Sequence, residues 1–259
     1  DRRWTTMSLP RNMLIEAYFK KLKMPQASKV YRSMAREAEN NNLGYEDYLL
    51  GVLEQEITQR ESNRIQRGIR HASFPVIKTL DSFDFRAIPA LNKQKVLKLA
   101  ACDYIKNLEN VILVGNSGVG KTHIATALAY EACRKGFKVK FYTAAGLINE
   151  LLAAQQEYKL NRLEKQFSAY HLVVIDELGY VPFSKTGAEL LFQFCSSRHE
   201  RGSVIITTNL EFPKWTEVFL DEQMTAALLD RLTHKAHILN INGESYRFKQ
   251  ALAKQQSSD

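Results

Sequence analysis

The sequence predicts an α/β fold with a central parallel sheet, preceded by a small all-helical domain. From residue 111 onward, short aliphatic runs such as "VILV", "LVVI" and "VIITT" alternate with helical segments. Unbroken apolar strands separated by helices are typical of a parallel sheet that is covered on both faces. The first part of the chain shows helical patterns alone, and 259 residues are enough for one large and one small domain. We therefore expect a helical domain over 1–74 and an α/β domain over 75–259.

The N-terminal domain is expected to hold three helices. Pro25 suits the first turn of the second helix, and the cluster "NNNLG" marks a turn before the third. In the first helix, Met13, Ala17 and Leu22 lie near one face with lysine and arginine opposite, so we expect this face to pack against the core. The three expected helices span residues 10–24, 25–42 and 45–71.

The α/β domain is expected to begin with an extended connector over 76–85 and an amphipathic helix over 92–109. A short helix is expected near Glu217. Five strands are expected over 111–114, 139–143, 172–176, 204–209 and 237–241. The longer helices between them are expected over 122–136, 144–170, 186–202 and 222–233.

Basic residues outnumber acidic ones, with 36 Lys and Arg against 28 Asp and Glu, so the formal net charge is +8. This excess suggests a polyanionic partner, most simply nucleic acid, although a generic basic surface has the same composition. The longest aliphatic runs are far too short to cross a bilayer, and no signal-peptide pattern opens the sequence. We expect a cytoplasmic protein with no membrane partner.

The cysteines and histidines give no indication of a metal site. Cys102, Cys133 and Cys195 lie far apart, and neither they nor the six histidines have the spacing of metal ligands. Scattered cysteines are typical of reduced, buried thiols in a cytoplasmic protein. We therefore expect no zinc site.

The segment "GNSGVGKT" follows the strand "VILV" and leads into a helix. Its glycines let the backbone turn tightly, so that successive N–H groups form a concave anion site at a helix N-terminus. Lys121 adds a charge that can reach the outer phosphates, and the Thr122 hydroxyl can ligate Mg²⁺. A plain turn is the alternative, but it does not explain the complete G-x-x-x-x-G-K-T pattern. The expected nucleotide contacts are Gly115, Asn116, Ser117, Gly118, Val119, Gly120, Lys121, Thr122 and His123.

Two carboxylates, Asp176 and Glu177, follow the apolar run "LVVI". Ligands of open α/β sheets bind at the carboxyl ends of the strands, which is where these side chains are expected. Asp176 can hold the Mg²⁺, and Glu177 can polarise the attacking water. A solvated pair at a strand end is the alternative, but the complete phosphate loop upstream favours the hydrolytic role.

Two further residues are candidates for the hydrolytic site. Asn209 ends the strand "VIITT", which we expect beside the other two, and its amide could hold the attacking water or the γ-phosphate; an ordinary turn asparagine is the alternative. Arg231 lies near the end of the last expected helix. A cation suits that position, but Arg231 could also reach the γ-phosphate of a neighbouring subunit as an arginine finger, and the spacing leaves both possibilities open.

Taken in order, the phosphate loop, "VVIDE", "IITTN" and "LLDRL" resemble the AAA+ ATPases of the initiator and helicase-loader clade. Within that clade, "FPVIKTLDSFDF", "GVGKTHIATALAYEACRKG", "IDELGYVPF" and "INGESYRFKQAL" are similar to IstB, the ATPase helper of a bacterial insertion-sequence transposase. The similarity covers nearly the whole chain. It implies an AAA+ α/β domain with a central parallel sheet that binds ATP and Mg²⁺.

The resemblance also implies roles for individual residues and partners. Adjacent subunits would share each ATP site, with Arg231 acting in trans and Asn209 as the first sensor residue. The sequence ends soon after "HILNI", so we expect no full C-terminal lid, and Arg247 could take part of the role of a lid-borne sensor. The protein would assemble with ATP on duplex DNA and recruit its cognate transposase. A DnaC-type loader of a replicative helicase is the alternative, because it shares the ATPase core.

Two stretches are candidates for contacts with DNA phosphates. The first is a helical stripe made up of Arg60, Arg64, Arg67 and His71. The second lies in a helical insert that faces the central channel in the initiator clade, and it is made up of Lys159, Arg162 and Lys165. Acidic residues are interspersed in both stretches, which is also typical of a solvated helix face.

Two other classes of function share some of these features. A P-loop kinase for a small metabolite would need an acceptor pocket and an arginine-bearing lid, and neither is evident in the sequence. A nucleotide-gated DNA-binding scaffold would not turn over ATP, and Glu177 argues against it. An ATPase therefore remains the expected activity.

Overall fold

The computed structural model describes residues 10–89, 91–180, 182–243 and 245. The chain divides into two compact units, Asp1–Gln66 and Arg67–Asp259. The boundary between them falls inside helix α3 (Tyr45–Ala72), because this helix runs unbroken from one unit into the other. The domain boundary that we expect, after residue 74, lies two residues beyond the end of that helix and stays a prediction.

The first unit is a small helical structure. Its helices are α1 (Arg11–Lys21), α2 (Pro25–Asn40) and most of α3. The prediction that Met13 and Leu22 face the core is wrong, since their exposed fractions are 53% and 64%. Ile15 and Phe19 of α1 face it instead, because these two side chains lie one turn apart and Phe19 packs 5.5 Å from the Tyr31 ring. The buried hydrophobic residues of this core are Ala27, Tyr31 and Val52.

A buried carboxylate joins two of these helices. Glu56 of α3 accepts the backbone N–H groups of Gln26 and Ala27 at 2.8 and 3.0 Å, in the first turn of α2. Its other oxygen accepts from Arg60 Nε at 2.8 Å. Burial by itself raises the pKa of Glu56, but the hydrogen bonds from Ala27 and Arg60 outweigh it and lower this pKa below its usual value. Glu56 is therefore an ionised cap for α2.

The second unit is built on a five-stranded sheet with the strand order β2-β3-β4-β1-β5. All four pairings are parallel, as the sequence predicts. The strands are β1 (Asn110–Val114), β2 (Val139–Thr143), β3 (Leu172–Leu178), β4 (Ser203–Thr208) and β5 (Ala236–Asn240). The helices are α4 (Lys93–Ala100), α5 (Asp103–Lys106), α6 (Lys121–Arg134), α7 (Ala144–Gln156), α8 (Leu160–Ser168), α9 (Lys185–Arg198), α10 (Thr216–Phe219) and α11 (Glu222–Thr233), with 3₁₀ turns at Phe85–Ala87 and Phe212–Trp215.

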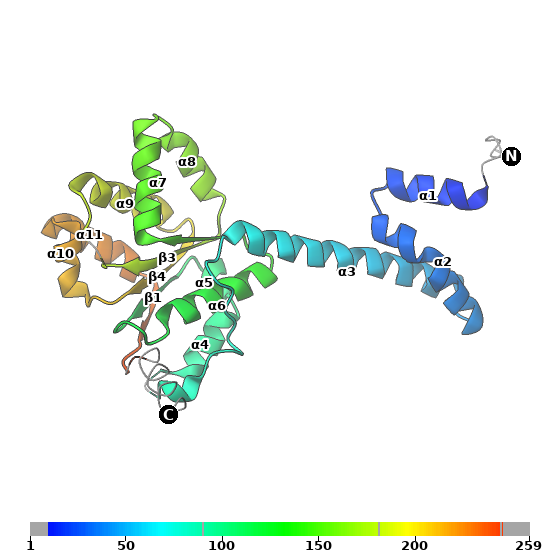
Figure 1. The fold of residues 1–259 in the computed structure, drawn as a ribbon, viewed down its shortest axis with the longest axis horizontal. Helices are drawn as coiled ribbons and strands as arrows, with labels where there is room; N and C mark the ends of the chain where they lie inside the picture. Colours follow the sequence, from blue (N-terminus) through cyan, green and yellow to red (C-terminus); the bar gives the residue numbers. More distant parts are fainter. Residues whose placement is uncertain (1–9, 90, 181, 244, 246–259) are drawn as a thin grey trace, which may run out of the picture. The chain divides into compact units, whose positions relative to one another are not determined.

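Helices cover both faces of this sheet (Figure 1). The side chains of Ile112, Ile175 and Ile206 join the core formed with α7, α9 and α11. The alternate strand residues point to the other face, as the two-residue period of a strand requires. Helix α6 packs against β1, β3 and β4, so its first turn is held at the carboxyl ends of these strands.

Two helices that the sequence predicts as continuous are broken. The segment 92–109 divides into α4 and α5 at Cys102, which has φ = 64° and is completely buried. The segment 144–170 divides into α7 and α8 at Tyr158, which has φ = 56°. A residue in the left-handed region ends a helix, and glycine or asparagine is the usual signal for it. Neither break carries such a residue at its left-handed position, so local preference does not explain them.

The three cysteines are free thiols inside the second unit, as expected. Burial raises the pKa of Cys102 to about 11 and that of Cys133 to about 12, so both thiols stay protonated and unreactive near neutral pH. Among the described helices, none combines the length and the apolar character that crossing a bilayer requires.

Candidate nucleotide-binding site

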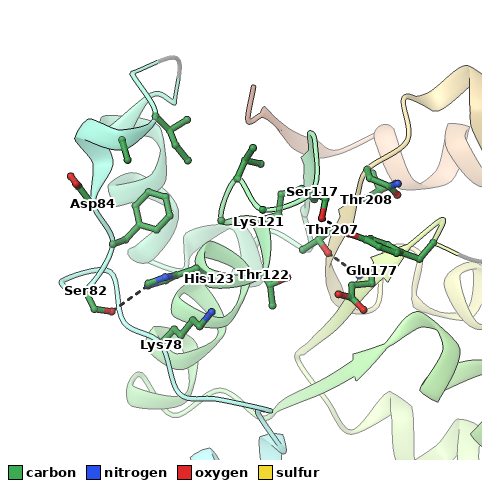
Figure 2. A pocket seen from close by; sticks show the side chains of 18 residues that line it. Lys78, Ser82, Asp84, Ser117, Lys121, Thr122, His123, Glu177, Thr207 and Thr208 are labelled. Carbon is green, nitrogen blue, oxygen red and sulfur yellow. Dashed lines mark hydrogen bonds between the residues drawn. The ribbon is translucent and has the colours of Figure 1, made fainter. Parts of the chain in front are cut away.

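The carboxyl ends of three adjacent strands, β1, β4 and β3, meet at one cavity of about 370 Å³ (Figure 2). The phosphate loop follows β1, Glu177 lies near the end of β3, and Asn209 follows β4. The structure thus brings together three segments that are far apart in the sequence. The cavity is lined by Lys78, Ser82, Phe83, Asp84, Ala87, Ile88, Ser117, Gly118, Val119, Gly120, Lys121, Thr122, His123, Glu177, Tyr180, Thr207, Thr208 and Asn209.

The loop between β1 and α6 has the backbone that a phosphate site needs. Gly118 and Gly120 have φ = 81° and 89°, which L side chains rarely adopt. A β-carbon at Gly120 would lie 2.7 Å from Phe83 Cε2, so the loop also depends on glycine for close packing. The Lys121 side chain is 8% exposed, and its ammonium group donates to the carbonyls of Gly115 and Asn116 at 2.6 and 2.7 Å. Its charge is therefore held over the loop.

A hydrogen-bonded network joins the first turn of α6 to β3 and β4. Thr122 Oγ1 donates to Asp176 Oδ1 at 3.0 Å, and Thr207 Oγ1 donates to the same oxygen at 2.5 Å. Asp176 and Thr207 are buried. A hydroxyl and a carboxylate oxygen are ligands that Mg²⁺ prefers, and few protein ligands suffice because this ion keeps several waters. The donor set at Thr122 and Asp176 therefore fits Mg²⁺.

Glu177 adopts an unusual backbone conformation. Its φ is 62°, and the pairing of β3 with β4 is irregular between Ile175 and Leu178. A non-glycine residue in this region costs on the order of 1–3 kcal/mol, and such strain clusters at functional sites. The Glu177 N–H donates to Thr207 Oγ1 at 2.9 Å, which fixes the turn (Figure 2). The exposed carboxylate is thereby placed in the wall of the cavity.

Asn209 contributes a buried acceptor to this wall. Its Oδ1 atom is inaccessible to solvent and has no hydrogen-bond partner among the described residues. Leaving such an atom unpaired costs about 1–3 kcal/mol, so a donor at this position would be stabilising. Solvent does not reach this oxygen, and the amide NH2 group can donate to a phosphate, so holding the attacking water and holding the γ-phosphate both stay predictions for Asn209.

The sequence did not identify three contributors to the cavity. Thr207 orients both acidic residues, and Tyr180 Oη lies 2.8 Å from Ser117 Oγ on the loop. The connector supplies a further wall, where His123 Nε2 lies 2.9 Å from Thr79 O and 3.2 Å from Ser82 Oγ. Burial lowers the pKa of His123, which favours the neutral ring. The first threonine of "VIITTN", at the end of an expected strand, was a sequence feature from which the role of Thr207 could have been predicted. The connector over 76–85 has no sequence feature that indicates a contact with the site.

Arg231 is not brought to the cavity of its own chain. Its guanidinium donates to Ser196 Oγ of α9 and lies 4.9 Å from the centroid of the Phe192 ring. The Asp221 cap of the same helix is present, with the carboxylate accepting from Met224 N at 2.6 Å. Within one chain, Arg231 therefore has a packing role, and any contact with a γ-phosphate has to be made in a different subunit.

The candidate DNA contacts differ in whether a carboxylate of the same chain already pairs with their charge. Arg60 is bound to Glu56 and also donates to the carbonyl of Lys23 at 2.5 Å, and Lys159 pairs with Glu157 at 2.6 Å. Three exposed candidates, Arg64, Arg162 and Lys165, have no such carboxylate within the described part of the chain. Arg67 lies on α3 and has further interactions. Arg247 and the expected lack of a lid concern residues outside those described.

Comparison with known proteins shows which family contains a chain with this site. A family model described as "IstB-like ATP binding protein" matches residues 17–254. The chain belongs to this family. An ATP-binding protein of insertion sequence IS21 from Pseudomonas aeruginosa is 38% identical to this IstB-like chain, over 91% of this chain and 89% of the relative. One of insertion sequence IS5376 from Geobacillus stearothermophilus is 36% identical, over 91% and 94%.

Solved structures show the fold of the IstB-like chain independently. DnaA from Aquifex aeolicus, determined with AMPPCP, aligns with a TM-score of 0.53 and 16% identity, over 71% of this chain and 56% of DnaA. DnaI aligns with a TM-score of 0.53 and 18% identity, over 68% and 93%. The second unit therefore has the AAA+ fold, and this IstB-like chain is an ATP-binding protein of that class.

Proposed function

We propose that this IstB-like protein is an ATPase that assembles on duplex DNA and recruits a transposase. One observation carries the hydrolytic part: Thr122, Asp176, Thr207 and Glu177 form one connected network beside the phosphate loop. The transposition part is supported by the relatives, whose names place them in insertion sequences. The net charge of +8 supports a DNA partner.

Each side chain has a defined task in this proposal. The loop N–H groups and the Lys121 ammonium would bind the triphosphate, and Thr122 and Asp176 would hold Mg²⁺. The metal would neutralise charge that develops on the phosphate oxygens. Glu177 would accept a proton from the attacking water, while the Asn209 amide would hold that water or the γ-phosphate. Thr207 would hold the Asp176 carboxylate and the backbone of Glu177 in place.

The proposed function is tested by measuring phosphate release with and without duplex DNA. We expect DNA to change the rate, because an ATPase that assembles on DNA couples the two binding events. A pull-down should then retain the transposase of the same insertion sequence. Retention of a replicative helicase, with no transposase, would favour the loader alternative. A rate that no duplex alters, at any salt concentration, would contradict the DNA-dependent part.

Arg231 supplies a separate prediction about shared sites. We expect Arg231→Ala to lower the hydrolysis rate by about 10³-fold, the lower end measured for arginine fingers. Subunits with Lys121→Ala carry an intact Arg231 and a dead phosphate loop, so mixing them with Arg231→Ala subunits should restore activity. Arg134→Ala, which removes an exposed cation paired with Glu131, is the control. If mixing restores no activity, Arg231 acts only within its own chain through Ser196 and Phe192.

A further inference from the structure

A second cleft, of about 350 Å³, is lined by residues of α8, of the last turn of α9 and of the turn that follows α9. It shares no lining residue with the nucleotide cavity. Its polar lining is strongly basic, and the one acidic side chain that lines it is Glu164. The other polar residues of the lining are Asn161, Lys165, Ser168, Ser197, Arg198 and Arg201.

Two of these cations are exposed and available. Neither Lys165 nor Arg201 makes a side-chain hydrogen bond or ion pair with any residue that the structure describes. Lys159, on the turn just before α8, is different because Glu157 holds its ammonium at 2.6 Å. Even with the Glu164 carboxylate in the lining, these two cations leave the cleft with an excess of positive charge.

A third cation lies buried in the wall. The Arg198 side chain is 5% exposed, and its guanidinium donates to the carbonyls of Phe167, Tyr170 and Ser203 at 3.0, 3.1 and 3.2 Å. Carbonyl groups satisfy these donors without cancelling the charge, and Arg198 forms no ion pair within the described residues. Burial lowers the pKa of Arg198 to about 10, so the group is still charged near neutral pH. A charge in a poorly solvated wall is weakly screened and raises the potential of the cleft.

The donors that face the cleft define the ligand chemistry. The hydroxyls of Ser168 and Ser197 each donate to a carbonyl of their own helix at 2.8 Å, to Lys165 O and Phe194 O. The donors of exposed lining residues that remain are the Lys165 ammonium, the Arg201 guanidinium and the Asn161 amide, and Arg198 Nε is a further donor without a partner that lies buried. These groups match the oxygens of a phosphate and offer little for distinguishing bases.

We propose that this cleft seats backbone phosphates of duplex DNA, with Lys165 and Arg201 as the contacting cations. The inference rests on the proposed function, since it names where the DNA of that function binds. Of the second stretch predicted from the sequence, only Lys165 lines this cleft, and Arg201 is a further cation that the sequence did not indicate. The Lys159 ammonium forms an ion pair with Glu157. An acidic segment of a partner protein is the competing occupant, and the experiment below separates the two.

The test measures binding of a fluorescent duplex by the full-length chain with a non-hydrolysable ATP analogue, over a series of salt concentrations. For Lys165→Gln/Arg201→Gln, we expect weaker binding and a shallower dependence of log K on log salt concentration, by about 0.9 for each lost phosphate contact. The same slope should be recovered by Lys165→Arg/Arg201→Lys, which keeps both charges. Lys106→Gln is the matched control and should leave the slope almost unchanged, because Lys106 is an exposed lysine that pairs with Asp103 and lies outside both candidate DNA stretches.

The outcomes are distinguishable. Both substituted side chains are exposed, so thermal unfolding of the double variant should match the wild type and exclude a folding defect. If the wild type binds duplex and the double variant keeps the wild-type slope, the cleft is not a phosphate seat. If the double variant binds duplex normally but loses the transposase, the cleft belongs to the protein partner and the inference is overturned. If the wild type itself binds no duplex, the proposed function fails with it.

Discussion

Glu177→Gln is expected to stop ATP hydrolysis while ATP binding is kept. The amide cannot accept a proton from water, and general-base catalysis is typically worth about 10²–10⁴-fold in rate. Binding should survive because the phosphate loop and the Thr122–Asp176 pair are untouched, and the backbone N–H that holds the turn to Thr207 is retained. Phosphate release and calorimetry with ATP measure the two properties separately. In the presence of DNA, the variant should accumulate in the assembled state.

The control for this substitution is Glu189→Gln, which removes an exposed carboxylate from α9, away from the lining of the cavity. It should hydrolyse ATP at the wild-type rate. A Glu177→Gln protein that does the same would show that another group activates the water, and the assignment of Glu177 would be wrong. Loss of ATP binding by this variant would instead point to a structural role for the strained turn.

Lys121→Ala is expected to abolish ATP binding. The substitution removes the only full positive charge contributed by the loop itself, between Gly115 and Thr122. It also leaves the carbonyls of Gly115 and Asn116 without their ammonium donor, which disturbs the shape of the loop. Calorimetry with magnesium and adenine nucleotides should show no heat of association, whereas the wild type should bind.

Lys135→Ala is the matched control for this prediction. Lys135 caps the other end of the same helix, and its ammonium also donates to a backbone carbonyl, that of Ala101, at 2.7 Å. The control should bind ATP as the wild type does. Binding of ATP by Lys121→Ala with unchanged affinity would mean that the nucleotide lies elsewhere, and the proposed roles of Asp176 and Glu177 would lose their basis.

The parts of the fold that follow from local chemistry were predictable. The five strands are apolar runs too short for helices and bounded by polar residues, and the phosphate loop is specified by glycines whose positive φ few other residues tolerate. The helix breaks at Cys102 and Tyr158 were not predictable, because neither residue prefers the left-handed region. The buried face of α1 was predicted wrongly, because apolar residues in this short, weakly amphipathic helix lie on more than one face.

The candidate site divides in the same way. Spacing located the residues at the strand ends, and the order of the strands then determined which of them meet. Contacts between distant segments could not be predicted, such as Tyr180 with Ser117, or His123 with Thr79. The roles assigned to Glu177, Asn209 and Arg231 stay predictions, because position alone does not establish chemistry.

The hydroxyl of Thr207 has a consequence for engineering the protein. One oxygen donates to Asp176 and accepts from the Glu177 backbone, so the residue that would carry the metal and the residue that would activate water, both on β3, share a single support on the neighbouring strand β4. Changing that support would loosen both together. A variant meant to stop the proposed hydrolysis while nucleotide and metal stay bound therefore has to change the Glu177 side chain, and not Thr207.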